Sequence, residues 1–232
     1  MSRSDLLRQC ATQKEGNMFV KLWMSKDPIV VTQEQTLAEA DAMMRQHAIR
    51  RLPVVDTERN LVGIITRKDI MKALPIDPPP DDTGMAGQIP VAAFMTASPI
   101  TADPMDPLET VTHIMRQNKI GGLPVVTHDG ALIGILTEAD ICRALMDILG
   151  AEESGARIEL QVGKTARELY ETFEIFKDFD MIVRSVAVYP DFSENQQLLT
   201  LRVKGDGLDT MLDALWKSGC KIHRIMVADE NG

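Results

Sequence analysis

Short apolar runs bounded by polar turn residues recur along the chain, and two of them are nearly identical. Residues 61–65 and 132–136 are each a five-residue aliphatic run with a glycine inside, followed by a threonine and, three residues later, an aspartate. Such a run predicts a buried strand, and the internal glycine indicates that another segment approaches it closely. The threonine and aspartate predict the start of a helix with a capping box.

The similarity between these two runs extends well beyond them in a constant register. An interval of 71 residues relates the matching segments of the two copies: Met24-Ser25 and Met95-Thr96, Pro28 and Pro99, Leu37 and Leu108, and residues 52–55 and 123–126. A register kept over about fifty residues without an insertion indicates an internal duplication. The order of apolar runs and helix-start signals predicts β-α-β-β-α for each copy.

Turn and cap residues support this assignment in the first copy. Thr36 and Glu39 form a capping-box pattern at the start of a helix. The apolar runs that follow predict a hairpin, in which we expect Asn60 to be the left-handed turn residue and to correspond to Gly130 of the second copy.

The motifs together resemble a known family. Met-Ser before Pro28, the Leu-Pro-Val-Val segment and Gly-Ile-Ile-Thr-x-x-Asp resemble the cystathionine-β-synthase (CBS) domain, and two in tandem resemble a Bateman module, an adenosine-nucleotide sensor. The resemblance implies an α/β (α+β) fold. We expect the following division of the chain: a flexible N-terminal tail over 1–17, CBS repeat 1 over 18–74, a Pro/Gly-rich linker over 75–92, and CBS repeat 2 over 93–149.

The remainder of the chain carries a different pattern. Its predicted elements are strands at 157–162, 182–188, 198–203 and 222–227, and helices at 165–176 and 208–216. The order βαββαβ predicts a ferredoxin-like sandwich over 155–232. This unit is similar to an ACT domain, a small regulatory module, and the whole layout resembles acetoin-utilisation-type regulatory proteins.

Four residues at the predicted helix starts are candidate ligand-binding groups: Thr66, Asp69, Thr137 and Asp140. The unpaired amides of a first helical turn favour an anion such as a phosphate. A carboxylate beside them can accept two hydrogen bonds from a ribose diol. The alternative, that these residues only cap their helices, stays open because a duplication copies caps as well.

Basic residues of the first repeat form a second candidate set: Arg50, Arg51, Arg67 and Lys68. In similar domains these positions lie near the phosphates of the ligand; the alternative is a solvated basic face. Their counterparts in the second repeat are Gly121-Gly122 and Glu138-Ala139, and the net charge falls from +1 over residues 22–74 to −3 over 93–145. A polyanionic ligand should therefore prefer the pocket that uses the first repeat's basic residues.

Composition excludes several classes of protein. A formal net charge of −9 argues against a general nucleic-acid binder, and no apolar run has the length of a membrane span. Cys10, Cys142 and Cys220 are scattered without metal-ligand spacing, which favours a reducing cytoplasmic location. We find no catalytic residues and no required metal.

The sequence therefore predicts a regulatory protein, not an enzyme, that binds an adenosine nucleotide (AMP, ADP or ATP, with S-adenosylmethionine and NAD as further candidates) between its CBS repeats. We expect it to relay occupancy to the ACT-like domain or to an unknown regulated protein, and to form a homodimer without nucleic-acid or membrane partners. The alternative is a protein-interaction scaffold with decayed nucleotide pockets; an enzyme is less well supported.

Overall fold

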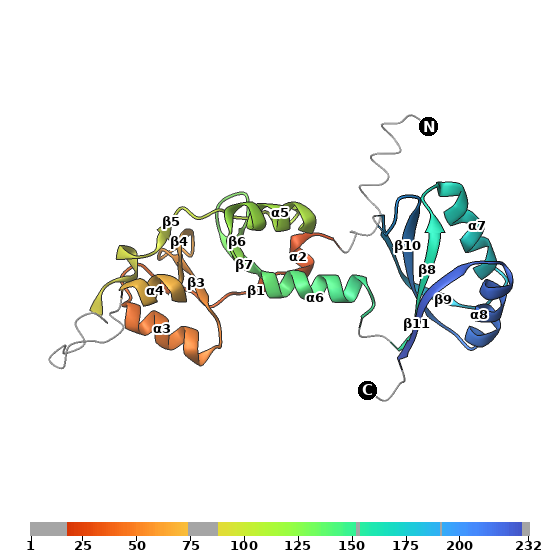
Figure 1. Cartoon of the computed structure of the whole chain (residues 1–232). Helices are drawn as coiled ribbons and strands as arrows, with labels where there is room; N and C mark the ends of the chain where they lie inside the picture. The colour runs from red at the N-terminus through yellow and green to blue at the C-terminus, as the bar shows by residue number, and fades with distance from the viewer. Residues whose placement is uncertain (1–17, 74–87, 152–153, 191, 229–232) are drawn as a thin grey trace. The chain divides into compact units, whose positions relative to one another are not determined.

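The computed structural model describes residues 18–73, 88–151, 154–190 and 192–228 (Figure 1). The tail expected over 1–17 and most of the linker expected over 75–92 lie outside the described residues. The chain divides into two compact units, Met1–Cys142 and Arg143–Gly232.

The first unit contains the two predicted repeats. The first repeat comprises α2 (Val20–Trp23), β1 (Ser25–Lys26), β2 (Val31–Thr32), α3 (Leu37–Gln46), β3 (Arg51–Val55), β4 (Leu61–Thr66) and α4 (Arg67–Ala73). The second repeat comprises the 3₁₀ helix η2 (Val91–Ala93), β5 (Thr96–Ala97), α5 (Leu108–Asn118), β6 (Gly122–Val126), β7 (Leu132–Thr137) and α6 (Glu138–Ile148), which extends past the boundary between the units. The predicted hairpins are β3–β4 and β6–β7, and the helices predicted to start at the two Thr-x-x-Asp motifs are α4 and α6. Thr36 caps α3 together with Glu39, as predicted.

The two repeats exchange their leading strands. β1 pairs antiparallel with β7, and β5 pairs antiparallel with β4, so each sheet is completed by a strand from the other repeat. The strand orders are β2-β3-β4-β5 and β1-β7-β6. Val91, which precedes β5, is fully buried in the core of the first repeat.

The exchange explains the glycine inside each central strand. A Cβ on Gly63 would lie 2.6 Å from Met95 Sδ, and a Cβ on Gly134 would lie 2.6 Å from Met24 Sδ. The close approach predicted at both glycines is therefore confirmed, and the approaching segment is the leading segment of the other repeat.

One turn prediction is wrong by one residue. The left-handed residue of the first hairpin is Arg59 (φ 67°), which the interval of 71 aligns with Gly130 (φ 89°). Asn60 instead donates its side-chain amide to Asp56 (Nδ2–Oδ2 3.1 Å) and forms an antiparallel bridge with Ala131. Because Asn60 and Ala131 are also 71 residues apart, this bridge joins equivalent positions of the two repeats.

The second unit is a four-stranded antiparallel sheet with two helices. Its elements are β8 (Gly155–Gly163), α7 (Ala166–Phe176), β9 (Ile182–Tyr189), β10 (Gln196–Lys204), α8 (Leu208–Lys217) and β11 (Lys221–Ala228). The strand order β11-β8-β10-β9 is the ferredoxin-like arrangement predicted from the sequence.

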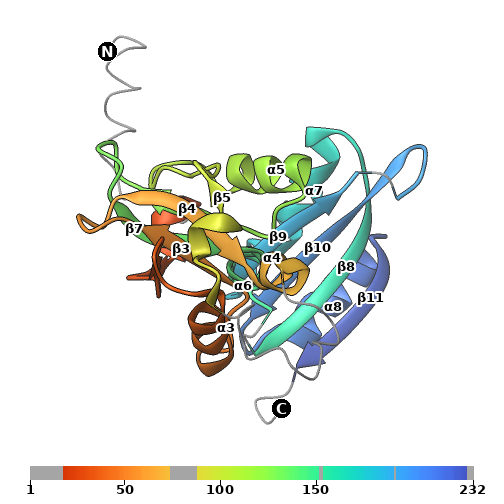
Figure 2. The same cartoon turned by 90° about the vertical axis from the view of Figure 1, so that its left-hand side faces the viewer.

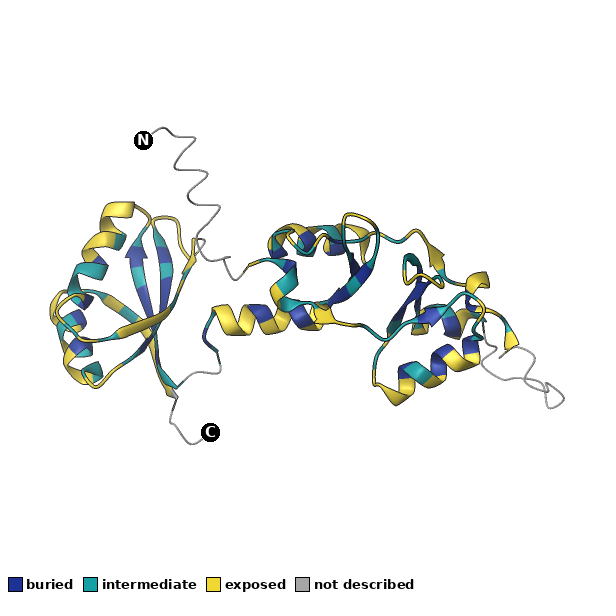
Figure 3. Ribbon diagram, turned by 180° about the vertical axis from the view of Figure 1, so that it is seen from behind, coloured by how far each residue is buried: buried dark blue, intermediate teal, exposed yellow. Residues whose placement is uncertain are grey.

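The helices α7 and α8 cover one face of this sheet (Figures 1 and 2). The core between the layers is built from alternate positions of the central strands, including Ile158, Leu160 and Leu201, with Met211 and Leu215 from α8. Figure 3 shows buried stretches within the strands of this sheet and exposed outer surfaces on its helices. In the described part of the chain, every helix is too short or too polar to cross a membrane.

Candidate functional site

Two cavities lie between the repeats and are related by the internal duplication. The larger cavity, of about 650 Å³, is lined by residues 25–29, 48–51 and 53 of the first repeat and by 121, 135 and 137–140 of the second. The smaller cavity, of about 440 Å³, is lined by residues 96, 99, 100 and 119–124 of the second repeat and by 50, 51, 64 and 66–68 of the first. Most lining residues of one cavity lie 71 positions from those of the other.

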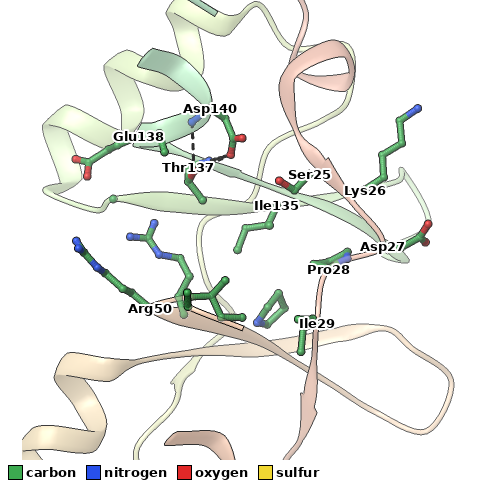
Figure 4. A pocket seen from close by; sticks show the side chains of 16 residues that line it. Ser25, Lys26, Asp27, Pro28, Ile29, Arg50, Ile135, Thr137, Glu138 and Asp140 are labelled. Atoms are coloured by element: carbon green, nitrogen blue, oxygen red, sulfur yellow. Dashed lines mark hydrogen bonds between the residues drawn. The ribbon is translucent and has the colours of Figure 1, made fainter. Parts of the chain in front are cut away.

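The exchange of strands creates these cavities. Ser25 pairs with Ile135 of β7, which brings the segment after β1 alongside the point where β7 ends and α6 begins. In the larger cavity, Pro28, Ile29 and Ile135 supply apolar surface. Figure 4 shows Glu138 and Asp140 on one wall and Arg50 on the wall opposite.

Thr137 and Asp140 form the predicted cap of α6. The Asp140 Oδ2 atom accepts hydrogen bonds from the backbone N–H of Thr137 (2.9 Å) and from its hydroxyl (2.6 Å), and Thr137 Oγ1 accepts from the Asp140 amide (3.3 Å). Asp140 is buried, and both residues line the larger cavity. Since a carboxylate has sites for about four hydrogen bonds, capping and ligand binding are compatible.

Thr66 and Asp69 repeat the same geometry at the start of α4. Asp69 Oδ2 accepts from the Thr66 amide (3.1 Å) and hydroxyl (2.6 Å), and Lys72 Nζ lies 3.7 Å from Asp69 Oδ1. Thr66 lines the smaller cavity, but Asp69 does not belong to the residues that line either one. The predicted site residues are therefore divided: Thr137 and Asp140 line the larger cavity, and Thr66, Arg67 and Lys68 line the smaller one.

The two cavities differ in charge. The smaller cavity is lined by Arg50, Arg51, Arg67, Lys68 and Lys119, and none of its described lining residues is acidic. The larger cavity combines three basic with three acidic residues: Lys26, Arg50, Arg51, Asp27, Glu138 and Asp140. All four basic residues singled out in the sequence thus line the smaller cavity, and two of them also line the larger.

Sequence reasoning missed Lys26, which lines the larger cavity, and Lys119, which lines the smaller one. Lys119 aligns with Ala48 of the first repeat, and both follow a helix and have left-handed backbones (φ 54° and 53°), but the alanine gives no chemical signal from which the sequence could identify Lys119. Asp27, also on the larger cavity, is left-handed too (φ 47°). Such backbone strain in residues other than glycine concentrates at ligand sites.

Arg51 lies at the junction of the cavities. Its Nη1 atom is buried and has no hydrogen-bond partner among the described residues. Burial lowers the pKa of the guanidinium, the Glu138 carboxylate opposes this shift, and Arg50 adds to it. An arginine remains charged under such conditions, so the site retains a partly desolvated cation.

The described residues contain no group of three His, Cys, Asp or Glu side chains that could hold a metal ion. The site therefore consists of apolar walls, helix N-termini, capping carboxylates and basic side chains. These groups suit a ligand that combines an apolar ring, hydroxyl groups and an anionic end.

Comparison with known proteins bears on the identity of the repeats. The CBS domain family model matches residues 20–76 and 91–147. The chain is 33% identical over 136 residues to a CBS domain-containing protein of Dictyostelium discoideum, covering 57% of the chain and 94% of that protein. It is 35% identical over 141 residues to inosine-5'-monophosphate dehydrogenase of Korarchaeum cryptofilum, but this match covers 59% of the chain and only 27% of the enzyme.

Two solved structures resemble the first unit. An acetoin utilization protein (AcuB) from Vibrio cholerae is 27% identical with a TM-score of 0.50, and the match covers 58% of this chain and 95% of that one. CBSX2 of Arabidopsis thaliana, solved in complex with AMP, is 27% identical with a TM-score of 0.50, and the match covers 56% of this chain and 98% of that one. Because the family model matches both repeats and the chain covers nearly all of a relative that is 33% identical, the chain belongs to the CBS-domain family and carries a tandem CBS pair.

Proposed function

We propose that this protein is a regulatory sensor that binds adenosine nucleotides between its CBS repeats. The observation that carries the proposal is the composition of the larger cavity. Ile29 and Ile135 offer apolar surface to a purine, the Asp140 carboxylate can accept hydrogen bonds from ribose hydroxyls, and the guanidinium of Arg51, whose Nη1 has no hydrogen-bond partner among the described residues, lines the cavity as a phosphate-binding group.

The dimensions and a relative support the same conclusion. Both cavities, at about 650 and 440 Å³, fall within the range of roughly 300–1,000 Å³ that small-molecule sites occupy. CBSX2, which shares the fold of the first unit, was solved in complex with AMP. AMP, ADP and ATP are therefore the first candidates, and S-adenosylmethionine and NAD contain the same adenosine group.

We assign the role of receiving the signal to the second unit. Its ferredoxin-like topology is the topology of ACT regulatory domains, so we propose that this ACT-like unit, or a protein bound to it, responds to nucleotide occupancy. In this role the protein needs no catalytic residues of its own and no metal.

We further propose that the protein is a homodimer. β9 is an edge strand of the described sheet, and it exposes Ile182 (54%), Val186 (48%) and Tyr189 (48%). Exposed apolar edge strands promote pairing between chains. Light scattering of the full chain at tens of micromolar should give twice the monomer mass of 25.7 kDa; a monomer mass would contradict this proposal.

The nucleotide proposal is tested by calorimetry and thermal unfolding of the full chain with AMP, ADP, ATP, NAD and S-adenosylmethionine. A ligand present at 100 times its Kd should raise the free energy of unfolding by about 2.7 kcal/mol. Tripolyphosphate is the control for anion binding without a nucleoside. If none of the five ligands binds, the cavities are not nucleotide sites, and the scaffold role becomes the better explanation.

A further inference from the structure

Arg51 is an arginine in the first repeat only, because the second repeat has a glycine at the equivalent position. It lines both cavities, and its guanidinium lies against Gly121 and Gly122 of the other repeat. A Cβ on Gly121 would lie 2.7 Å from Arg51 Nη2, and a Cβ on Gly122 would overlap Nη1. Gly122 is the counterpart of Arg51, so the absence of a side chain in the second repeat makes room for the arginine of the first.

The guanidinium is incompletely satisfied at this junction. Its buried Nη1 lacks a hydrogen-bond partner among the described residues, and an unpaired buried donor is costly. A phosphate in either cavity meets the same guanidinium, because Arg51 lines both, and a guanidinium fork binds the oxygens of one phosphate in a bidentate manner. One such fork cannot serve two phosphates equally well.

The surroundings of Arg51 differ on its two sides. Glu138, on the larger cavity, has its Oε2 2.9 Å from the Cβ position of Gly121, the same position that Arg51 Nη2 approaches. The smaller cavity adds the positive charges of Arg67, Lys68 and Lys119. A phosphate in the smaller cavity therefore meets further cations, whereas one in the larger cavity also meets a carboxylate.

On the basis of the proposed function, we propose that Arg51 is a single phosphate-binding group shared by the two cavities, so that a nucleotide phosphate bound in one cavity weakens phosphate binding in the other. Two phosphates at this junction repel each other and compete for the same donors. The coupling should reduce the affinity of the second nucleotide by about 5- to 150-fold, the usual range of coupling between sites. Adenosine, which has no phosphate, should bind without this coupling.

The test compares AMP with adenosine in calorimetric titrations of the full chain. The two cavities differ in volume and charge, so adenosine reports their intrinsic difference in affinity. We expect the ratio of the two AMP affinities in the wild-type protein to exceed the ratio of the two adenosine affinities by at least about fivefold. Arg51→Gln removes the shared charge and should bring the two AMP affinities closer together. Arg50→Ala is the matched control. Arg50 also lines both cavities but is exposed, whereas the guanidinium of Arg51 lies against Gly121 and Gly122, so the loss of Arg50 should weaken AMP binding but preserve the unequal steps.

A variant that exchanges the residues at positions 51 and 122 controls for loss of structure in Arg51→Gln. Arg51→Gly combined with Gly122→Arg moves the arginine to the equivalent position of the other repeat, and we expect it to restore unequal AMP binding that Arg51→Gln has lost. An AMP affinity ratio no larger than the adenosine ratio in the wild-type protein, or an AMP ratio that is unchanged in Arg51→Gln, would overturn the proposal.

Inorganic pyrophosphate separates this inference from the proposed function. If AMP and adenosine both fail to bind, the nucleotide proposal is wrong, and pyrophosphate still tests the shared guanidinium. We expect one pyrophosphate per chain, with affinity reduced at least tenfold in Arg51→Gln. Two equivalent pyrophosphate sites, or no dependence on Arg51, would show that the guanidinium is not a shared anion site.

Discussion

Replacing Asp140 with alanine separates the two roles that its carboxylate can have, in capping α6 and in binding a ribose. The cap consists of the hydrogen bonds from the Thr137 amide and hydroxyl to Oδ2, at 2.9 and 2.6 Å. Loss of a cap of this kind costs about 0.5–2 kcal/mol of unfolding free energy. Loss of hydrogen bonds from a ligand to a charged group costs about 1.5–3 kcal/mol, which corresponds to a roughly 10- to 150-fold rise in the Kd for AMP.

The assays are urea denaturation for stability and calorimetry for AMP affinity. Asp140→Asn retains an oxygen that accepts from the Thr137 amide, so it should lose less stability than Asp140→Ala while still binding AMP more weakly. Glu39→Ala is the matched control for capping alone. Glu39 accepts from the Thr36 amide (2.7 Å) and hydroxyl (3.0 Å) in the same way, but it lines neither cavity.

We expect Glu39→Ala to lower stability with unchanged AMP affinity, and Asp140→Ala to change both. A destabilised Asp140→Ala variant with wild-type AMP affinity would refute the reasoning and restrict Asp140 to capping. The same measurement on Asp69→Ala tests the sequence-based prediction that Asp69 also holds a ribose, since Asp69 has the same cap contacts but lies outside the lining of the smaller cavity.

Three further predictions concern other parts of the chain. Gly63→Ala should lower the unfolding free energy by about 1–3 kcal/mol through overpacking, because its Cβ would lie 2.6 Å from Met95 Sδ and 3.1 Å from the Thr96 carbonyl oxygen; urea denaturation checks this, and a wild-type midpoint would contradict it. Affinity at the smaller cavity should rise from AMP to ATP and the gain should shrink at high salt, whereas Arg67→Ala should reduce the gain; equal, salt-insensitive affinities would place these basic side chains in solvent. Hydrogen bonds from the Thr165 hydroxyl and amide lower the pKa of Glu168 below 4.5, so this contact should stabilise the fold above about pH 4.5 and lose its effect as the pH falls through the lowered value. Thr165→Val should therefore destabilise the protein more at neutral pH than in acid, where only the loss of the hydrogen bond from the Glu168 amide to the Thr165 hydroxyl remains, as followed by denaturation across pH; a pH-independent difference would contradict this assignment.

The sequence predicts the local elements well because their signals are local. The capping box of Thr36 and Glu39, the periodic helices and the alternating strands of the second unit depend on neighbouring residues, and the strand expected at 157–162 is found at Gly155–Gly163. The pairing partners of the strands, in contrast, are not determined by neighbouring residues. β1 and β5 have two residues each, and so short a segment has no periodicity from which its place in the sheet of the other repeat could be predicted. Gly63 and Gly134 indicated a close approach without identifying the segment that makes it.

The candidate site was predictable in its residue types more than in their grouping. Arg50 and Arg51 were expected in one basic pocket, but both line the two cavities because the junction is common to them. Lys119 was missed because its counterpart, Ala48, has no chemistry that a comparison of the copies would reveal. Asp69 was expected to face a ligand because of its spacing from Thr66. This spacing determines the contact that caps the helix, but it does not determine where a cavity lies.

Some lining positions at which the repeats differ affect one cavity, and others affect both. A change at Arg67 or Lys68 alters only the smaller cavity, and a change at Glu138 or Ala139 alters only the larger one. Position 51 is of the other kind, because its side chain lies at the junction against Gly122, its own counterpart. With arginine at both 51 and 122 the side chains would overlap, and with glycine at both the junction would lose the guanidinium that lies against the second repeat. One guanidinium at this pair of positions is therefore the arrangement that fits, and it makes the two cavities unequal even where their remaining walls match.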